Sequence, residues 1–144
     1  MRLARRIALV IGPVVALAAG CGRKEETGGA PSHHPRDAEL RGIIDRALAR
    51  DDALVAAAEK AGRDCAAMAR SFTEVVEEYR DVLGHDELES DPALRARFEE
   101  LAGEHGERRG KWAERFARAI APCTTNVAVN GALAPLERDP LRAD

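Results

Sequence analysis

Apolar side chains recur every three or four positions from residue 37 to about residue 121, and this spacing restricts the fold more than any other feature. The first run contains Leu40, Ile44, Ala47, Leu54 and Ala58. A period near 3.6 is typical of helices with one buried face. The chain has 28 Ala but only 3% aromatic residues, and few stretches alternate with period two, which excludes a β-sandwich or barrel. The sequence therefore predicts an all-α protein.

The helix boundaries follow from capping residues, glycines and prolines. A first helix is expected over residues 37–61, with Asp37 as its N-cap and with Asp51 and Asp52 as a point where it breaks into two pieces. A second helix is expected from Asp64, as N-cap, to residue 83, where Gly84 ends it. Residues 85–91 are expected to form a polar turn.

The third predicted helix covers residues 92–121 and is the longest. Asp91 and Pro92 form a strong start signal, and glycines at 103, 106 and 110 favour a kink in its middle. A short fourth helix is expected within residues 124–136, capped by Thr125 or Asn126. We therefore predict a small antiparallel bundle of three or four helices over residues 37–136, followed by a disordered tail over residues 137–144.

The segment before the helices has the features of an export signal. Residues 1–6 carry three Arg, and a run of apolar residues follows from 7 to 19. That run is too short to span a bilayer, which needs about 20 residues. We expect residues 1–20 to be a signal peptide that is removed.

The end of this segment, LAAGC over residues 17–21, resembles the lipobox of bacterial lipoproteins, with Ala18 where Leu is the commonest residue. The resemblance implies cleavage just before Cys21 and attachment of a diacylglycerol to its thiol. It also implies a membrane-bound protein of the cell envelope, and Gly22 points to the outer membrane. The alternative is an ordinary secretory peptide, cut after Ala19 or Gly20, with an incidental cysteine.

Residues 21–36 are polar and rich in Gly and Pro, so we expect a flexible tether that holds the domain about 20 Å from the membrane. Two adjacent histidines, His33 and His34, are expected to bind metal only weakly there. Loss of residues 1–20 leaves 19 Lys and Arg against 25 Asp and Glu, a net charge of −6. An acidic chain without interleaved basic and aromatic residues is not expected to bind nucleic acid.

Two further cysteines, Cys65 and Cys123, lie on apolar helix faces. An exported chain meets an oxidising compartment, and the cysteine number is even once Cys21 carries lipid. A disulfide would join the start of the second helix to the end of the third, although the third is predicted to be longer. Two buried free thiols are the alternative. This arrangement resembles helical exported proteins of bacteria that have no known activity.

Motifs of enzymes and cofactor sites are missing from the sequence. It contains no H-E-x-x-H, no G-x-S-x-G and no C-x-x-C-H, and GERRGKW at residues 106–112 is one residue short of a phosphate loop. His105 together with Met68 is a conceivable metal or haem ligand pair, but a histidine on an apolar stripe more often packs at a bundle edge. We expect no catalytic residue, metal or cofactor.

These observations lead to one functional hypothesis and two alternatives. The leading hypothesis is a membrane-anchored envelope lipoprotein with a non-enzymatic binding or structural role, whose partners are the membrane and an envelope protein. The alternatives are a small ligand- or metal-binding helical bundle and an enzyme with no recognisable motif. The basic stretch over residues 108–118 is expected to be a solvated helix face.

Overall fold

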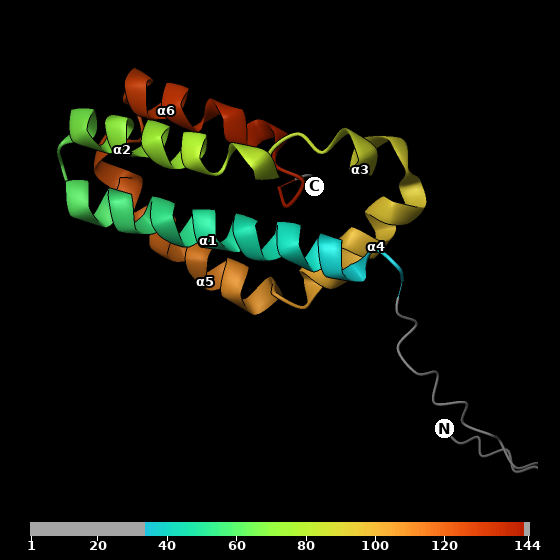
Figure 1. Cartoon of the computed structure of the whole chain (residues 1–144). Helices are drawn as coiled ribbons and strands as arrows, with labels where there is room; N and C mark the ends of the chain where they lie inside the picture. Colours follow the sequence, from blue (N-terminus) through green and yellow to red (C-terminus); the bar gives the residue numbers. More distant parts are fainter. Residues whose placement is uncertain (1–33, 143–144) are drawn as a thin grey trace, which may run out of the picture. The chain divides into compact units, whose positions relative to one another are not determined.

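The computed structural model describes residues 34–142, which form helices and connecting turns with no β-strand (Figure 1). This confirms the predicted all-α fold. No helix in this part of the chain combines the length and apolar character needed to cross a bilayer.

Six α-helices and three short 3₁₀ helices make up the described residues. The α-helices are α1 (Asp37–Ala61), α2 (Cys65–Glu78), α3 (Asp86–Ser90), α4 (Pro92–Gly103), α5 (Gly106–Ile120) and α6 (Val127–Leu133). The 3₁₀ helices are η1 (Arg80–Val82), η2 (Ala121–Cys123) and η3 (Ala134–Arg138).

The body of the bundle is formed by α1, α2, α5 and the α6–η3 unit. Helix α2 lies between α1 and α6, while α5 packs on another side of α1 (Figure 1). Two ion pairs set the register of α5 on α1: Arg108 with Asp52 at 2.5 Å, and Arg115 with Glu59 at 2.6 Å. Both pairs join residues 56 positions apart, so α1 and α5 run in the same direction. Helix α2 runs opposite to both, as an antiparallel bundle requires.

Three of the predicted helix starts are confirmed by side-chain capping. The carboxylate of Asp64 accepts a hydrogen bond from the amide of Ala67 at 2.9 Å. The carboxylate of Asp91 accepts hydrogen bonds from the backbone amides of Ala93 and Leu94, and Pro92 occupies the first helical position. Asn126, one of the two residues proposed for the last helix, caps α6 through its side-chain oxygen. Each cap satisfies amides that have no partner inside the helix.

Asp37, predicted as the N-cap of the first helix, is instead its first residue, and Arg36 occupies the cap position. The carboxylate of Asp37 bonds to the guanidinium of Arg97 on α4, at 2.9 and 2.6 Å. The predicted break at Asp51 and Asp52 is also wrong, because α1 continues through both residues. Asp51 pairs with the adjacent Arg50 and Asp52 pairs with Arg108, so neither carboxylate competes for the helix backbone.

The single long helix predicted over residues 92–121 is two helices. Helix α4 ends at Gly103 and α5 begins at Gly106, and the amides of Glu104 and His105 bond carbonyls only three residues back. Residues 85–91, predicted as a turn, contain the one-turn helix α3. Helix α2 ends at Glu78 rather than at residue 83, and η1 follows it. These breaks turn the chain around the end of the bundle that holds the start of α1.

The buried apolar side chains form two clusters along α1. The first holds Leu40, Ile44, Ala47, Leu48, Val82, Leu88, Leu94, Phe98, Leu101, Ala102 and Leu141. The second holds Leu54, Val55, Ala58, Met68, Ala69, Phe72, Val76, Phe116, Cys123, Val129 and Leu136.

The C-terminal segment is not the disordered tail that was predicted from residue 137. Its residues are described to 142, and Leu136, Asp139 and Leu141 are buried. Leu136 belongs to the second cluster and Leu141 to the first, so the segment joins the two. The sequence shows no periodic pattern here because the segment is not one regular helix, and only contacts with distant residues keep it in place.

The charged side chain that holds this segment is Arg50, which has no exposed surface. Its Nη2 donates to Asp139 at 2.5 Å and to Asp51 at 2.7 Å, while the backbone amide of Leu141 bonds the other oxygen of Asp139 at 3.0 Å. Burial lowers the pKa of Arg50, but the two carboxylates outweigh burial and the net pKa is raised. Burial raises the pKa of Asp51, and Arg50 opposes that shift.

Loss of Asp139 is expected to destabilise the bundle strongly. Asp139→Ala leaves a buried guanidinium short of one counter-charge, which lowers the free energy of unfolding by about 3–5 kcal/mol. Urea denaturation followed by circular dichroism measures this. The control is Glu137→Ala, an exposed change two residues away, which should cost at most about 0.5 kcal/mol. Equal effects of the two variants would contradict a buried ion pair at Asp139.

The ion pair between Asp37 and Arg97 predicts a specific acid sensitivity. Hydrogen bonds from Arg97 lower the pKa of Asp37 to about 2, against about 3.9 for an unfolded chain. Since the unfolded chain protonates first, this contribution to stability is complete above pH about 4 and is lost as pH falls towards 2. Asp37→Asn should therefore flatten the fall in melting temperature over this range. Asp45→Asn, an exposed change on the same helix, should leave the slope as in the wild type.

Candidate functional site

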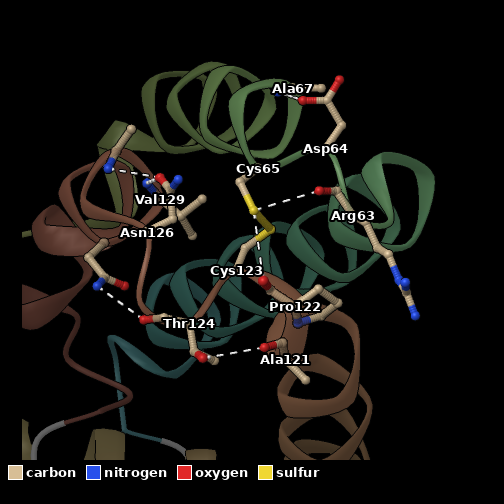
Figure 2. The surroundings of a disulfide bond; sticks show 12 residues. Arg63, Asp64, Cys65, Ala67, Ala121, Pro122, Cys123, Thr124, Asn126 and Val129 are labelled. Carbon is tan, nitrogen blue, oxygen red and sulfur yellow. Dashed lines mark hydrogen bonds between the residues drawn. A yellow bond between two sulfur atoms is a disulfide. The ribbon is translucent and has the colours of Figure 1, made fainter.

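The three site residues that the sequence predicts have different outcomes. Cys21, the predicted lipidation site, lies outside the described residues. Cys65 and Cys123 are joined by a disulfide, with their Cα atoms 5.5 Å apart. Figure 2 shows the bond between the start of α2 and the turn that leads from α5 to α6. We call this part of the bundle, residues 59–70 and 114–136, the disulfide end.

The unequal helix lengths that seemed to oppose this bond are resolved by the break in the third predicted helix. Helix α5 has 15 residues and α2 has 14, so the two helices match in length. The excess residues form α3 and α4 at the opposite end of the bundle. Cys123 lies in η2 directly after α5, and Cys65 is the first residue of α2.

The turn around the disulfide is fixed by its own hydrogen bonds (Figure 2). The side-chain amide of Asn130 donates to the carbonyl of Thr124 at 3.2 Å, and the Thr124 hydroxyl donates to the carbonyl of Ala121 at 3.3 Å. The Asn126 side chain caps α6 in the same turn. Cys123 is buried, with 1% of its surface exposed, whereas Cys65 is half-buried. The disulfide end is therefore held by covalent, polar and apolar contacts together.

A second feature is an open groove of about 520 Å³ beside α1 and α5. Its floor includes Val55 and Trp112. The indole Nε1 donates to the carbonyl of Asp51 at 2.6 Å, and the ring stacks on Phe116 with centroids 4.9 Å apart. The guanidinium of Arg142 lies 5.3 Å from the indole centroid. The indole of Trp112 therefore already has a hydrogen-bond acceptor, a stacked ring and a nearby cation within the domain.

The basic stretch of α5 forms one wall of this groove. Three of its cations have carboxylate partners: Arg108 with Asp52, Lys111 with Glu107, and Arg115 with Glu59. These pairs are exposed, and such pairs contribute little to stability. The cations that line the groove are therefore matched by carboxylates and leave no excess charge with which to attract an anion.

The pair His105 and Met68, considered above as metal or haem ligands, is not brought together. Met68 is fully buried in the second cluster, whereas His105 lies at the break between α4 and α5 and lines the groove. Among residues 34–142 there is no group of three or more His, Cys, Asp and Glu side chains that could hold a metal ion. His33 lies outside the described residues.

Arg50 and Asp139 are the site residues that sequence reasoning missed. Arg50 lies three residues after Ala47 and four before Leu54, on the apolar face of α1, and a charge at such a position signals a buried partner. The sequence carries no comparable signal for Asp139, because its segment lacks periodicity.

Comparisons with protein-family models, curated proteins and solved structures gave no match for this chain.

The disulfide should make a large contribution to the stability of the domain. It closes a loop of 58 residues, which in the chain-entropy model stabilises by about 4 kcal/mol. Cys65→Ala with Cys123→Ala should therefore lower the melting temperature markedly, while helix content persists in buffer because the apolar clusters remain. Differential scanning calorimetry and circular dichroism measure the two effects.

A thiol assay gives the matched control for this prediction. The oxidised chain carrying Cys21→Ser should show no alkylation after denaturation without reductant, because the two remaining cysteines are bonded to each other. Alkylation of both Cys65 and Cys123 under these conditions would contradict the disulfide and leave them as small core residues.

Proposed function

We propose that this chain is a lipid-anchored protein of the bacterial cell envelope, and that its helical domain has a non-enzymatic binding or structural role there. The observation that carries the proposal is the sequence LAAGC at residues 17–21, which follows a basic and then an apolar segment. Diacylglycerol on Cys21, with a further acyl chain, would hold the protein on the membrane permanently, since each buried CH₂ contributes about 0.8 kcal/mol.

The disulfide supports the export part of this proposal. Disulfides persist in oxidising compartments, such as the periplasm, and are rare in the cytosol. The domain holds one between Cys65 and Cys123, and no third cysteine follows Cys21 that could compete for either partner. Under this proposal each of the three cysteines has a defined use.

The geometry of α1 gives the anchored domain a direction. The tether joins the domain at the start of α1, and this helix has 25 residues, which corresponds to about 37 Å of rise. The disulfide end lies at the other end of α1. An anchor at Cys21 would therefore attach the bundle through the end formed by α3 and α4 and leave the disulfide end as the part farthest from the attachment point.

The way in which titratable groups are used supports a non-enzymatic role. The buried guanidinium of Arg50 pairs with Asp51 and Asp139, Arg142 supplies a second cation to Asp139, and the cations of the groove pair with carboxylates. A general acid or base needs a group that is free to exchange a proton with a bound molecule. The charged groups around Arg50 and in the groove already form ion pairs within the domain.

Replacement of Cys21 tests the anchor. Cys21→Ser removes the thiol that accepts the lipid, so the variant should accumulate as an uncleaved precursor or as soluble protein. Membrane fractionation and metabolic labelling with a palmitate analogue measure both outcomes in cells. The wild type should be labelled and should separate with the outer-membrane fraction.

The matched control is Cys65→Ser with Cys123→Ser, which removes the other two cysteines and leaves Cys21. This variant should remain membrane-bound and labelled. If Cys21→Ser is cut normally and the wild type is soluble and unlabelled, the segment is an ordinary secretory peptide and the anchor is disproved.

A further inference from the structure

Charge is distributed unevenly along the bundle. The disulfide end carries five Lys and Arg against three Asp and Glu, a net charge of +2. The other described residues carry twelve against nineteen, a net charge of −7. An acidic domain thus presents one basic end, and that end is the one farthest from the start of α1.

The cations of the disulfide end also differ from the others in their pairing. Only Arg115 of the five forms an ion pair, whereas ten of the other twelve described cations do. The four without an ion pair to any described residue are all exposed, and they are Lys60, Arg63, Arg70 and Arg118. These four can be contacted by carboxylates without first losing a partner within the described chain.

Three of these cations lie at one level along the bundle axis. The offset of 56 residues between α1 and α5 places Arg118 level with Gly62, between Lys60 and Arg63 in height. Gly62 makes the turn there with φ of 59°, in the left-handed region that glycine tolerates best. The turn brings Arg63 directly after the last turn of α1, which contains Lys60.

An uncharged segment lies at the same end of the bundle as the cations, because the disulfide joins Cys123 to Cys65, two residues after Arg63. Residues 121–136 contain no charged side chain, in a chain where 33% of residues are charged. Ala121, Pro122, Val127 and Ala128 are exposed within this segment, and Val127, at 86%, is the only exposed large hydrophobic side chain among the described residues. Interface centres are depleted in charge and are surrounded by polar rims, and this surface has both properties.

The surface is also rigid. The disulfide anchors Cys123 to α2, and the turn after it is held by the bonds of Thr124, Asn126 and Asn130 (Figure 2). A surface that is already ordered loses little conformational entropy when it binds.

We propose that the disulfide end is a docking surface for an acidic protein, in which carboxylates of the partner contact Lys60, Arg63 and Arg118 while an uncharged patch packs over Val127 and Ala128. The inference rests on the proposed binding role and specifies its site and the chemistry of the partner. Complementary charge speeds association and fixes orientation, so the interaction weakens with salt.

A protein fits this surface better than other polyanions do. Nucleic acid and anionic membranes present extended arrays of phosphate, which would also face the rest of the domain with its net charge of −7. A protein can place a few carboxylates at the disulfide end alone. No exposed aromatic side chain among residues 34–142 lies beside Val127 to enter a bilayer interface.

Site-specific photocrosslinking in cells tests the docking surface. A photoreactive phenylalanine analogue at position 127 of the full-length chain should give one discrete protein product, and mass spectrometry should place the link in an acidic peptide of the partner. Lys60→Glu, Arg63→Glu and Arg118→Glu combined should lower the yield by about tenfold or more. The probe at position 89, on α3 at the other end, should not give this product.

The matched control reverses three cations outside the disulfide end, Arg80→Glu, Arg95→Glu and Lys111→Glu, with the same change in net charge. Its yield should stay within about twofold of the wild type. The purified oxidised domain supplies a second readout, since it should bind poly-L-glutamate in a salt-sensitive way that the first triple variant loses.

Several outcomes would overturn the proposal. These are equal loss in both triple variants, no product at position 127, links only to lipid or peptidoglycan, or equal binding to phosphatidylglycerol vesicles and to poly-L-glutamate. The failure would be separable from failure of the anchor. A wild type that is lipidated and membrane-bound but gives no acidic partner removes the docking surface alone, whereas an unlipidated wild type that still gives the product removes the anchor alone.

Discussion

The ion pair between Arg50 and Asp139 is the interaction on which the arrangement of this bundle depends most. Both side chains are withdrawn from water, and without Asp139 the buried guanidinium would keep only Asp51 as a counter-charge, which is strongly unfavourable. The pair therefore forces the C-terminal segment against the middle of α1. In that position Leu136 enters one apolar cluster and Leu141 enters the other. A segment without any helical period becomes the link between two halves of the core.

The second constraint is the disulfide, which requires α2 and the helix that leads to Cys123 to have similar lengths. A continuous helix over residues 92–121 would overshoot α2 and carry Cys123 away from Cys65. The break at Glu104 and His105 shortens the helix that packs on α1 to 15 residues, and the ion pairs of Arg108 and Arg115 then fix its register. The glycines at 103 and 106 flank the break, where their low helix propensity is useful rather than harmful.

These two constraints divide the molecule into ends of different character. The end formed by α3 and α4 is acidic and carries the start of α1. The disulfide end is basic, partly uncharged and rigid. The proposed anchor rests on the LAAGC sequence at residues 17–21, whereas the proposed docking surface rests on this distribution of charge.

The sequence alone determined the features that depend on neighbouring residues. The 3.6-residue period, the caps at Asp64, Asp91 and Asn126, and the parity of the cysteines all act within a few residues or by counting, so the all-α class and the Cys65–Cys123 bond could be predicted. The LAAGC motif at residues 17–21, on which the proposed anchor rests, is likewise read from the sequence alone.

Only the tertiary structure decided the rest. The continuity of α1 through Asp51 and Asp52 depends on cations, one of them on α5, and the displacement of Asp37 from its cap depends on Arg97, which is 60 residues away. Burial of the C-terminal segment depends on an ion pair that spans 89 residues. Local periodicity and capping carry no information about such partners, because the energy of a buried charge is set by what the folded chain brings beside it.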